Sequence, residues 1–184
     1  MKLKHIYLCL IVCICFLLSA CFFNDDRDVG LEVRYNGIAI GFIEHETDFD
    51  EAVRIMRSRF FSSADAPIIT PEFVLRELRG DEMYARPNEL ADNLIKASGV
   101  AIEEAAGFFV DGVFYGATTD VHALLEALDN ILTNSSPRFE GERVEFFYPV
   151  RIESAIYPAS SITPLNDILS KAGPFLSVIT IFSE

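Results

Sequence analysis

Two dipeptides that favour tight turns, Asn36-Gly37 and Asp111-Gly112, stand 75 residues apart in a chain of 184 residues. Each lies between two short apolar segments, so each predicts a β-hairpin closed by a type I′ turn, whose central residues both take positive φ. Gly41 and Gly116 follow four positions after the turn glycines, and we assign them to turns and bulges rather than to phosphate binding. A hairpin that occurs twice at one spacing indicates an internal repeat.

The 75-residue offset extends beyond the turns. Comparing residues 31–97 with residues 106–172 gives ten identities in 67 positions, and the hydrophobic period changes from two to about 3.6 at corresponding places. After each hairpin we expect a helix, then an extended segment, then a short closing helix. The predicted elements are a helix at 49–60 with Thr47 or Asp48 as N-cap, extended segments at 68–78 and 143–157, a helix at 121–132 capped by Asp120, and closing helices at 87–97 and 164–172.

The predicted fold class is therefore α+β, with two tandem ββαβα units whose antiparallel hairpins are each covered by helices. The first unit spans residues 31–99 and the second spans residues 100–174. Residues 100–107 have helical propensity, yet Val100 and Ile102 share the strand parity of Phe108, so we predict a strand there. Residues 175–184 are predicted to be a terminal strand without a partner, which would suit the truncated start of a further domain.

The N-terminus has the pattern of an export signal. A short basic start precedes an uncharged apolar run at residues 6–23, whose length is at the lower limit for crossing a bilayer. The sequence Leu18-Ser19-Ala20-Cys21 resembles the bacterial lipoprotein signal, in which cleavage precedes a cysteine that becomes acylated. Residues 1–20 would be the signal peptide and residues 21–30 the lipidated cysteine with an acidic tether. The body would then lie on the extracytoplasmic face of the membrane, with a single uncleaved transmembrane anchor or ordinary secretion as the alternatives.

Composition excludes several classes of protein. All four cysteines lie within the first 21 residues, so the body has neither a disulfide framework nor a multi-cysteine metal site. Lys and Arg number 15 against 28 Asp and Glu; cleavage before Cys21 removes Lys2 and Lys4 but no acid, which leaves 13 minus 28, or −15. Nucleic-acid binding is excluded because it needs a basic surface that neutralises phosphates.

Several motifs together resemble a family of cell-wall proteins. They are Tyr35-Asn36-Gly37-x-x-x-Gly41, its second copy Val110-Asp111-Gly112-x-x-x-Gly116, the segment Tyr157–Ile162 and the segment Asn166–Leu169. In this order they resemble the N-terminal region of Firmicutes cell-wall lipoproteins and peptidoglycan endopeptidases of the lysostaphin type, which are often associated with LysM modules. The resemblance covers residues 31–184 and implies a wall-associated protein, but the zinc motifs of the catalytic domain are missing.

No catalytic, metal-binding or cofactor-binding residues are predicted. A lysostaphin-type site needs a His-x-x-x-Asp and a His-x-His motif, whereas the mature chain has only His45 and His122, which we interpret as exposed residues near helix starts. There is no Gly-x-Ser-x-Gly sequence for a serine nucleophile. Asp48, Asp50 and Glu51 fall in a predicted first helical turn, where acids complement the helix dipole.

Three hypotheses for function follow. The first is a non-enzymatic, membrane-anchored extracytoplasmic lipoprotein that acts as a cell-wall-associated spacer or interaction module, with the membrane and peptidoglycan or other cell-wall proteins as its partners. The second is a ligand-binding or sensor lipoprotein with its site between the two units. The third is a fragment of a peptidoglycan metalloendopeptidase whose catalytic domain is missing. Repulsion from anionic wall polymers is expected at a net charge of −15.

Overall fold

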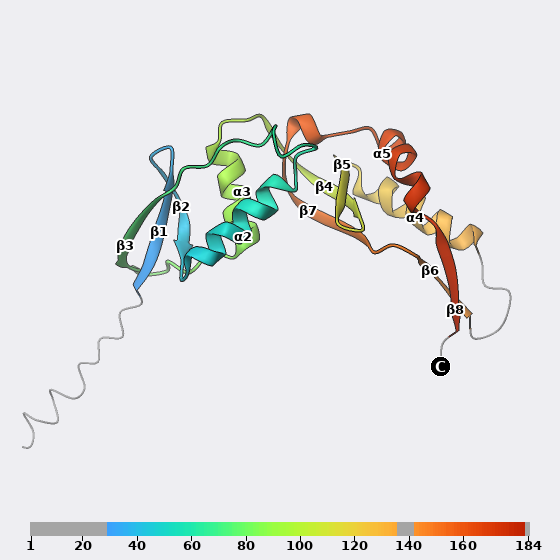
Figure 1. Ribbon diagram of the computed structural model, residues 1–184, viewed down its shortest axis with the longest axis horizontal. Helices are drawn as coiled ribbons and strands as arrows, with labels where there is room; N and C mark the ends of the chain where they lie inside the picture. The colour runs from blue at the N-terminus through green and yellow to red at the C-terminus, as the bar shows by residue number, and fades with distance from the viewer. Residues whose placement is uncertain (1–28, 136–141, 183–184) are drawn as a thin grey trace, which may run out of the picture.

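The computed structural model describes residues 29–135 and 142–182, and the following concerns those residues. They contain four α-helices and eight strands arranged in three small antiparallel sheets, which confirms the α+β class. The molecule is an elongated arch, with the first three strands at one end and β6 and β8 at the other (Figure 1). We refer to residues 29–97 as the first half and to residues 102–182 as the second half.

The first half is a three-stranded sheet with two helices. Strand order is β2-β1-β3, and every pairing is antiparallel. Asn36 and Gly37, between β1 and β2, have φ values of 52° and 77°, the geometry of a type I′ turn. Pairing then shifts at Val33, because Ile40 is an extra residue on β2 beside Gly41. The elements are β1 (Val29–Tyr35), β2 (Ile38–Ile43), α2 (Glu46–Arg57), β3 (Glu72–Glu77) and α3 (Pro87–Ala97).

The second half begins with a similar arrangement. Its larger sheet has the order β5-β4-β7, again antiparallel, and β4 confirms the strand predicted from parity at residues 100–107. Asp111 and Gly112 have φ values of 50° and 76°, and Tyr115 is the extra residue of a bulge beside Gly116. The elements are β4 (Ile102–Val110), β5 (Val113–Thr118), α4 (Val121–Asn134), β7 (Val150–Pro158), a 3-10 turn η1 (Ala159–Ser161) and α5 (Leu165–Ala172).

The prediction of a single extended segment at residues 143–157 is wrong. It is two strands, β6 (Glu142–Phe146) and β7, which belong to different sheets and are separated by Phe147–Pro149. Pro149 has no N–H to donate, which suits the break between them. The strand predicted at the C-terminal end has a partner, because β8 (Val178–Phe182) pairs with β6 after a 3-10 turn, η2 (Gly173–Phe175). The expectation of an unpaired terminal strand is therefore also wrong.

The first helix differs from the prediction, which was residues 49–60, at both of its ends. Helix α2 begins after His45 and ends at Arg57, so Thr47 lies inside the helix. Asp48 is the third helical residue, and its carboxylate accepts a hydrogen bond from the His45 N–H at 3.2 Å. In α4 the predicted cap is present, since Asp120 Oδ1 accepts from Ala123 N at 2.9 Å. The sequence pattern therefore located the helices, but it misplaced the cap of the first helix by two or three residues and its end by three.

Predictions about the N-terminal segment lie outside the described residues. These are the signal peptide at 1–20, the signal residues Leu18, Ser19 and Ala20, and the lipidated Cys21. The tether predicted at 21–30 is too long by two residues, because Val29 and Gly30 already belong to β1. Within residues 29–135 and 142–182, no helix combines the length and apolar character needed to cross a bilayer.

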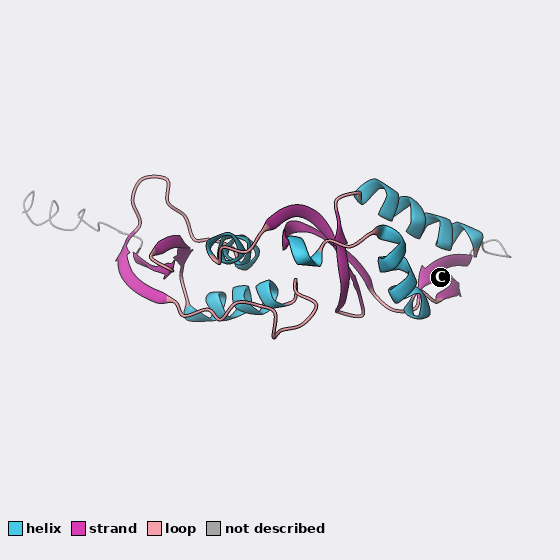
Figure 2. Cartoon of the chain, turned by 90° about the horizontal axis from the view of Figure 1, so that it is seen from above, coloured by secondary structure: helices cyan, strands magenta, loops and turns pink. Residues whose placement is uncertain are grey.

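Two main cores correspond to the two halves. In the first half α2 and α3 pack on one face of the sheet, and in the second half α4 and α5 pack on one face of β4, β5 and β7. Ile156 of β7 belongs to the first core, so the long β4–β7 ladder contributes to both. Seen from above, these strands lie between the helices of the first half and α4 and α5 (Figure 2). The β4–β7 ladder thus connects the two halves by packing into both cores, in addition to the covalent link along the chain.

Candidate functional site

The two halves meet at Arg59, which follows the end of α2. Its side chain is 1% exposed, although arginine is seldom fully buried unless its charge is paired. One guanidinium nitrogen, Nη1, donates to the Asp92 carboxylate of α3 and to the Ile156 carbonyl at 3.2 Å. The other, Nη2, donates to Glu153 Oε1 of β7 at 3.0 Å. Arg59 therefore joins a helix of the first half to a strand of the second.

Further hydrogen bonds cross the same boundary. Ser161 Oγ donates to the Arg59 carbonyl at 2.8 Å, and the Ile156 N–H donates to Asp92 Oδ1 at 3.3 Å. Glu153 also pairs with Arg151, so two arginines face two carboxylates and the charges balance. Arg59 Nε is buried without a hydrogen-bond partner in the described part of the chain. We call this set of contacts the junction.

Aromatic side chains make further contacts between the two halves beside Arg59. Phe61, two residues after Arg59, packs on Phe114 of β5 with ring centroids 5.4 Å apart, and Phe114 stacks on Tyr157 at 5.8 Å. The Arg59 guanidinium lies 5.5 Å from the centroid of the Tyr157 ring. These contacts cover the face of the second sheet opposite α4 and α5, and the covering residues belong to the first half.

Tyr157 is held in place by its own strand and by Gly107. Its hydroxyl donates to the Glu153 carbonyl at 2.9 Å, and burial raises the pKa of the Tyr157 phenol above its usual range. Gly107 lies beneath the ring: a Cβ there would be 2.1 Å from the Tyr157 hydroxyl oxygen. Only glycine leaves room for this ring, so Gly107 is a structural requirement of the junction.

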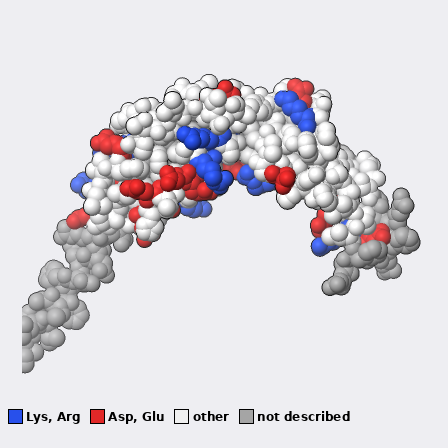
Figure 3. Space-filling view, viewed as in Figure 1, with Lys and Arg blue, Asp and Glu red and all other residues white. Residues whose placement is uncertain are grey.

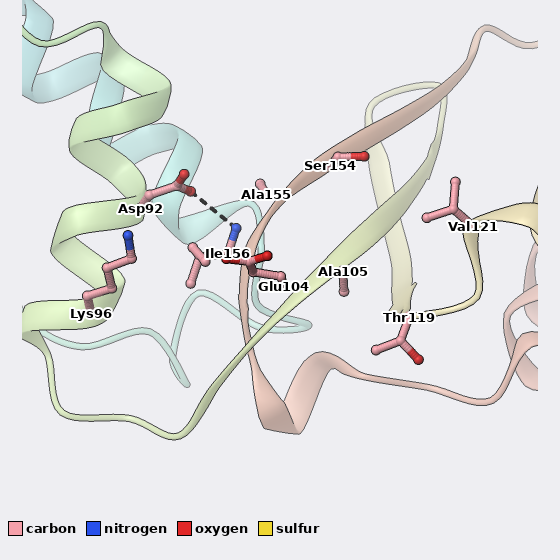
Figure 4. Close-up of a pocket in the computed structure, with 9 residues that line it drawn as sticks. All are labelled: Asp92, Lys96, Glu104, Ala105, Thr119, Val121, Ser154, Ala155 and Ile156. Atoms are coloured by element: carbon pink, nitrogen blue, oxygen red, sulfur yellow. Dashed lines mark hydrogen bonds between the residues drawn. The ribbon is translucent and has the colours of Figure 1, made fainter.

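A groove opens beside the junction, where α3 faces the ends of β4 and β7. Its volume is about 410 Å³. Figure 4 shows Asp92 and Lys96 on α3 opposite Glu104 of β4, with the hydrogen bond between Ile156 and Asp92 at its base. Neither Lys96 nor Glu104 has an ion-pair partner among the described residues. Figure 3 shows charged side chains gathered along the concave side between the halves. The groove can accept a small polar molecule.

The histidines singled out in the sequence do not form a site. His45 and His122 lie on different helices, at the N-cap of α2 and in the first turn of α4, and both side chains are exposed. Within the described ranges, no group of three His, Cys, Asp or Glu side chains is close enough to hold a metal ion. Glu51 forms an ion pair with Arg54 one turn later, and the hydrogen bond from Arg54 lowers the pKa of the Glu51 carboxyl. These residues act within their own helices.

A second ion-pair network lies on the outer face of the first sheet. Arg76 of β3 contacts Glu32 at 2.9 Å and Glu82 at 2.7 Å, and its guanidinium stacks 4.1 Å from the centroid of the Phe42 ring. The hydrogen bond from Arg76 lowers the pKa of Glu82 from 4.5 to about 2, and Arg76 likewise lowers the pKa of the buried Glu32. This network ties the segment after β3 to the sheet.

Sequence reasoning missed the junction residues. Arg59 lies within the apolar stripe of the predicted first helix, between Met56 and Phe60. A charged residue inside an apolar stripe was the one sequence feature that could have indicated a buried ion pair. Its partners Asp92 and Glu153 lie 33 and 94 residues away, so no local pattern connects them. The turn residues Asn36, Gly37, Asp111 and Gly112 are far simpler to recognise because their conformation depends on neighbouring residues.

Comparisons with known proteins found nothing similar: no protein-family model, no curated protein and no solved structure matches this chain.

Proposed function

We propose that the chain is a non-enzymatic lipoprotein, anchored through Cys21 on the extracytoplasmic face of a bacterial membrane, where it serves as a rigid spacer or interaction module of the cell wall. The observation that carries this proposal is the junction. A buried arginine that is hydrogen-bonded to both halves favours one fixed arrangement, because moving the halves apart would break its hydrogen bonds to Glu153 and to the Ile156 carbonyl. A spacer needs this property, since it must keep its length.

The elongated shape supports the same proposal. The strand that follows the N-terminal segment, β1, lies at one end of the arch, and β6 and β8 lie at the other (Figure 1). A lipid at Cys21 would therefore hold one end at the membrane while the second half extends outward. The resemblance of the turn motifs to those of wall proteins favours the cell wall as the place where that outer end acts.

We further propose that the two halves arose by tandem duplication. Both contain a type I′ hairpin with a bulge beside a glycine, and both have a parallel bridge from the second strand, Phe42 to Tyr84 and Ala117 to Ile162. A Cβ on Gly41 would lie 3.0 Å from Leu90, and one on Gly116 would lie 3.1 Å from Ile168.

These contacts change the alignment of the closing helices. Leu90 corresponds to Ile168, 78 residues later, whereas the uniform offset of 75 paired it with Leu165. Three additional residues between the second hairpin and its closing helix account for the change.

Ligand binding in the groove is the second candidate function. Lys96 and Glu104 offer opposite charges across a space of about 410 Å³, which fits a small zwitterion such as an amino acid. Isothermal titration with a panel of amino acids tests this candidate. Saturable binding that Lys96→Met abolishes would support it, and no heat from any member of the panel would count against it.

The main proposal is tested by retention on insoluble peptidoglycan. The detergent-solubilised full-length protein should sediment with purified peptidoglycan, and an unrelated acidic protein of similar size and charge should stay in the supernatant. Membrane fractionation tests the anchor, because Cys21→Ser should remove the lipid that mass spectrometry detects on the wild-type protein. Equal sedimentation of both proteins, or an unmodified Cys21, would contradict the proposal.

A further inference from the structure

A continuous group of aromatic side chains lies at the surface of the second half, with Phe147 and Phe175 exposed and Tyr115 and Tyr148 half-buried against the second core. The rings are in sequential contact: Phe147 with Tyr148 at 4.9 Å, Tyr148 with Phe175 at 6.2 Å, and Phe175 with Tyr115 at 6.0 Å between centroids. Phe147 is 57% exposed and Phe175 is 44% exposed, although large aromatic rings are normally used for burial. We call Tyr115, Phe147, Tyr148 and Phe175 the aromatic patch.

The backbone beneath the patch is fixed. The Phe147 N–H donates to the Ser177 carbonyl at 2.9 Å, which joins the segment between β6 and β7 to the segment before β8. The Pro149 carbonyl accepts from the Asp111 N–H at 2.9 Å, which joins the same segment to the second hairpin. Pro149 and Pro174 further restrict these two segments. The backbone that carries the rings is therefore held in position before any partner binds, which lowers the entropy lost on binding.

The patch is uncharged in a strongly acidic protein. Neither residues 147–149 nor residues 173–177 include a charged side chain, whereas the whole chain has a formal net charge of −13. Asp111 borders the patch through its backbone hydrogen bond. An anionic polymer would gain no attraction here and would be repelled by the surrounding protein, so the chemistry of the patch favours a neutral partner.

The two tyrosines add hydrogen-bonding groups. Within residues 29–135 and 142–182, neither the Tyr115 hydroxyl nor the Tyr148 hydroxyl has a hydrogen-bond partner in the protein. A hydroxyl both donates and accepts, and covering it with a lipid chain or an apolar protein surface would leave it unsatisfied at a cost. A hydroxyl-rich partner avoids this cost.

We propose that the aromatic patch binds a neutral glycan chain. The apolar C–H faces of sugar rings can pack on the exposed phenyl rings while sugar hydroxyls bond the two tyrosines, so one ligand matches both chemistries of the patch. The patch lies on the half away from β1, where a lipid-anchored protein would meet wall polysaccharide (Figure 1). This inference rests on the proposed wall association and names the wall component that is bound.

The test is a titration of the full-length, detergent-solubilised protein with the hexamer of N-acetylglucosamine, a neutral soluble glycan. The chain has no tryptophan and six tyrosines, two of them in the patch, so tyrosine fluorescence reports binding there. We expect saturable binding that weakens about tenfold or more in Phe147→Ser/Phe175→Ser, because two ring contacts are lost. Tyr148→Phe should weaken binding several-fold by removing one hydroxyl.

Met83→Ser is the matched control, because Met83 is 79% exposed on the first half and its loss should leave glycan binding unchanged. The absence of saturable binding, or equal binding by the double variant and the wild type, would overturn the inference. Sedimentation with peptidoglycan is measured on the same samples. Wild-type sedimentation without hexamer binding would overturn the glycan inference and keep the wall proposal, whereas hexamer binding without sedimentation would keep the glycan site and overturn the wall proposal.

Discussion

Replacing Arg59 by methionine tests the role of the junction. The substitution keeps a similar apolar stem but removes the guanidinium, so Asp92 loses its ion-pair partner within the first half. Across the junction, Glu153 and the Ile156 carbonyl each lose a donor. Removing one partner from a buried pair typically costs about 3–5 kcal/mol. Because Asp92 and Glu153 keep some solvent contact and Glu153 keeps Arg151, we expect the lower end of this range, about 3 kcal/mol.

Urea unfolding of the full-length protein, followed by circular dichroism, measures this loss. With a slope of about 2 kcal/mol per molar urea, the midpoint of Arg59→Met should fall by roughly 1.5 M. Arg57→Met is the matched control: Arg57 is exposed two residues earlier, and its replacement should change stability by no more than about 0.5 kcal/mol. If both variants unfolded at the same urea concentration, the argument that Arg59 holds the halves together would be refuted.

Three other substitutions test separate parts of the structure. Gly107→Ala should destabilise the protein by about 2–3 kcal/mol, because the new methyl group would collide with the Tyr157 hydroxyl. Gly173 has open space around it, so Gly173→Ala should be nearly neutral, and thermal unfolding of the two variants tests this difference. Glu82→Gln should lower stability fully at pH 7 and progressively less as the pH falls from 4.5 through 2, because the wild-type carboxylate, with its pKa lowered to about 2, contributes above pH 4.5 and loses that contribution on passing below 2. A stability difference independent of pH would contradict this sign. Asp120→Ala should cost about 1 kcal/mol through loss of the α4 cap, and an unchanged urea midpoint would show that the cap is unimportant.

Local features of this fold follow closely from the sequence. The turn at Asn36-Gly37 depends on two adjacent residues that tolerate positive φ, and the α3 boundaries, Pro87 to Ala97, coincide with the predicted range. The β4 strand was also identified, and the burial of both faces from Ala105 to Val110 outweighs the helical propensity of its alanines and glutamates. Each of these features is determined within a few residues.

The remaining features depend on contacts between distant residues. The break at Pro149 divides two strands that share one apolar pattern, and only the pairing of β6 with β8 shows that they belong to different sheets. The junction joins Arg59 to residues 33 to 102 positions away. Periodicity describes which face of an element is apolar, but it does not determine which other element covers that face.

Rigid connection of the two halves is the central claim, and a distance distribution between them tests it most directly. Spin labels are attached to cysteines introduced at Asp50 of α2 and Asp129 of α4, which are both exposed helical positions. Pulsed electron paramagnetic resonance then measures the distribution of distances between the two labels. We predict one narrow distance peak for the native junction and a broad distribution in the Arg59→Met background. A broad distribution in both proteins would show that the halves move independently and would contradict the account.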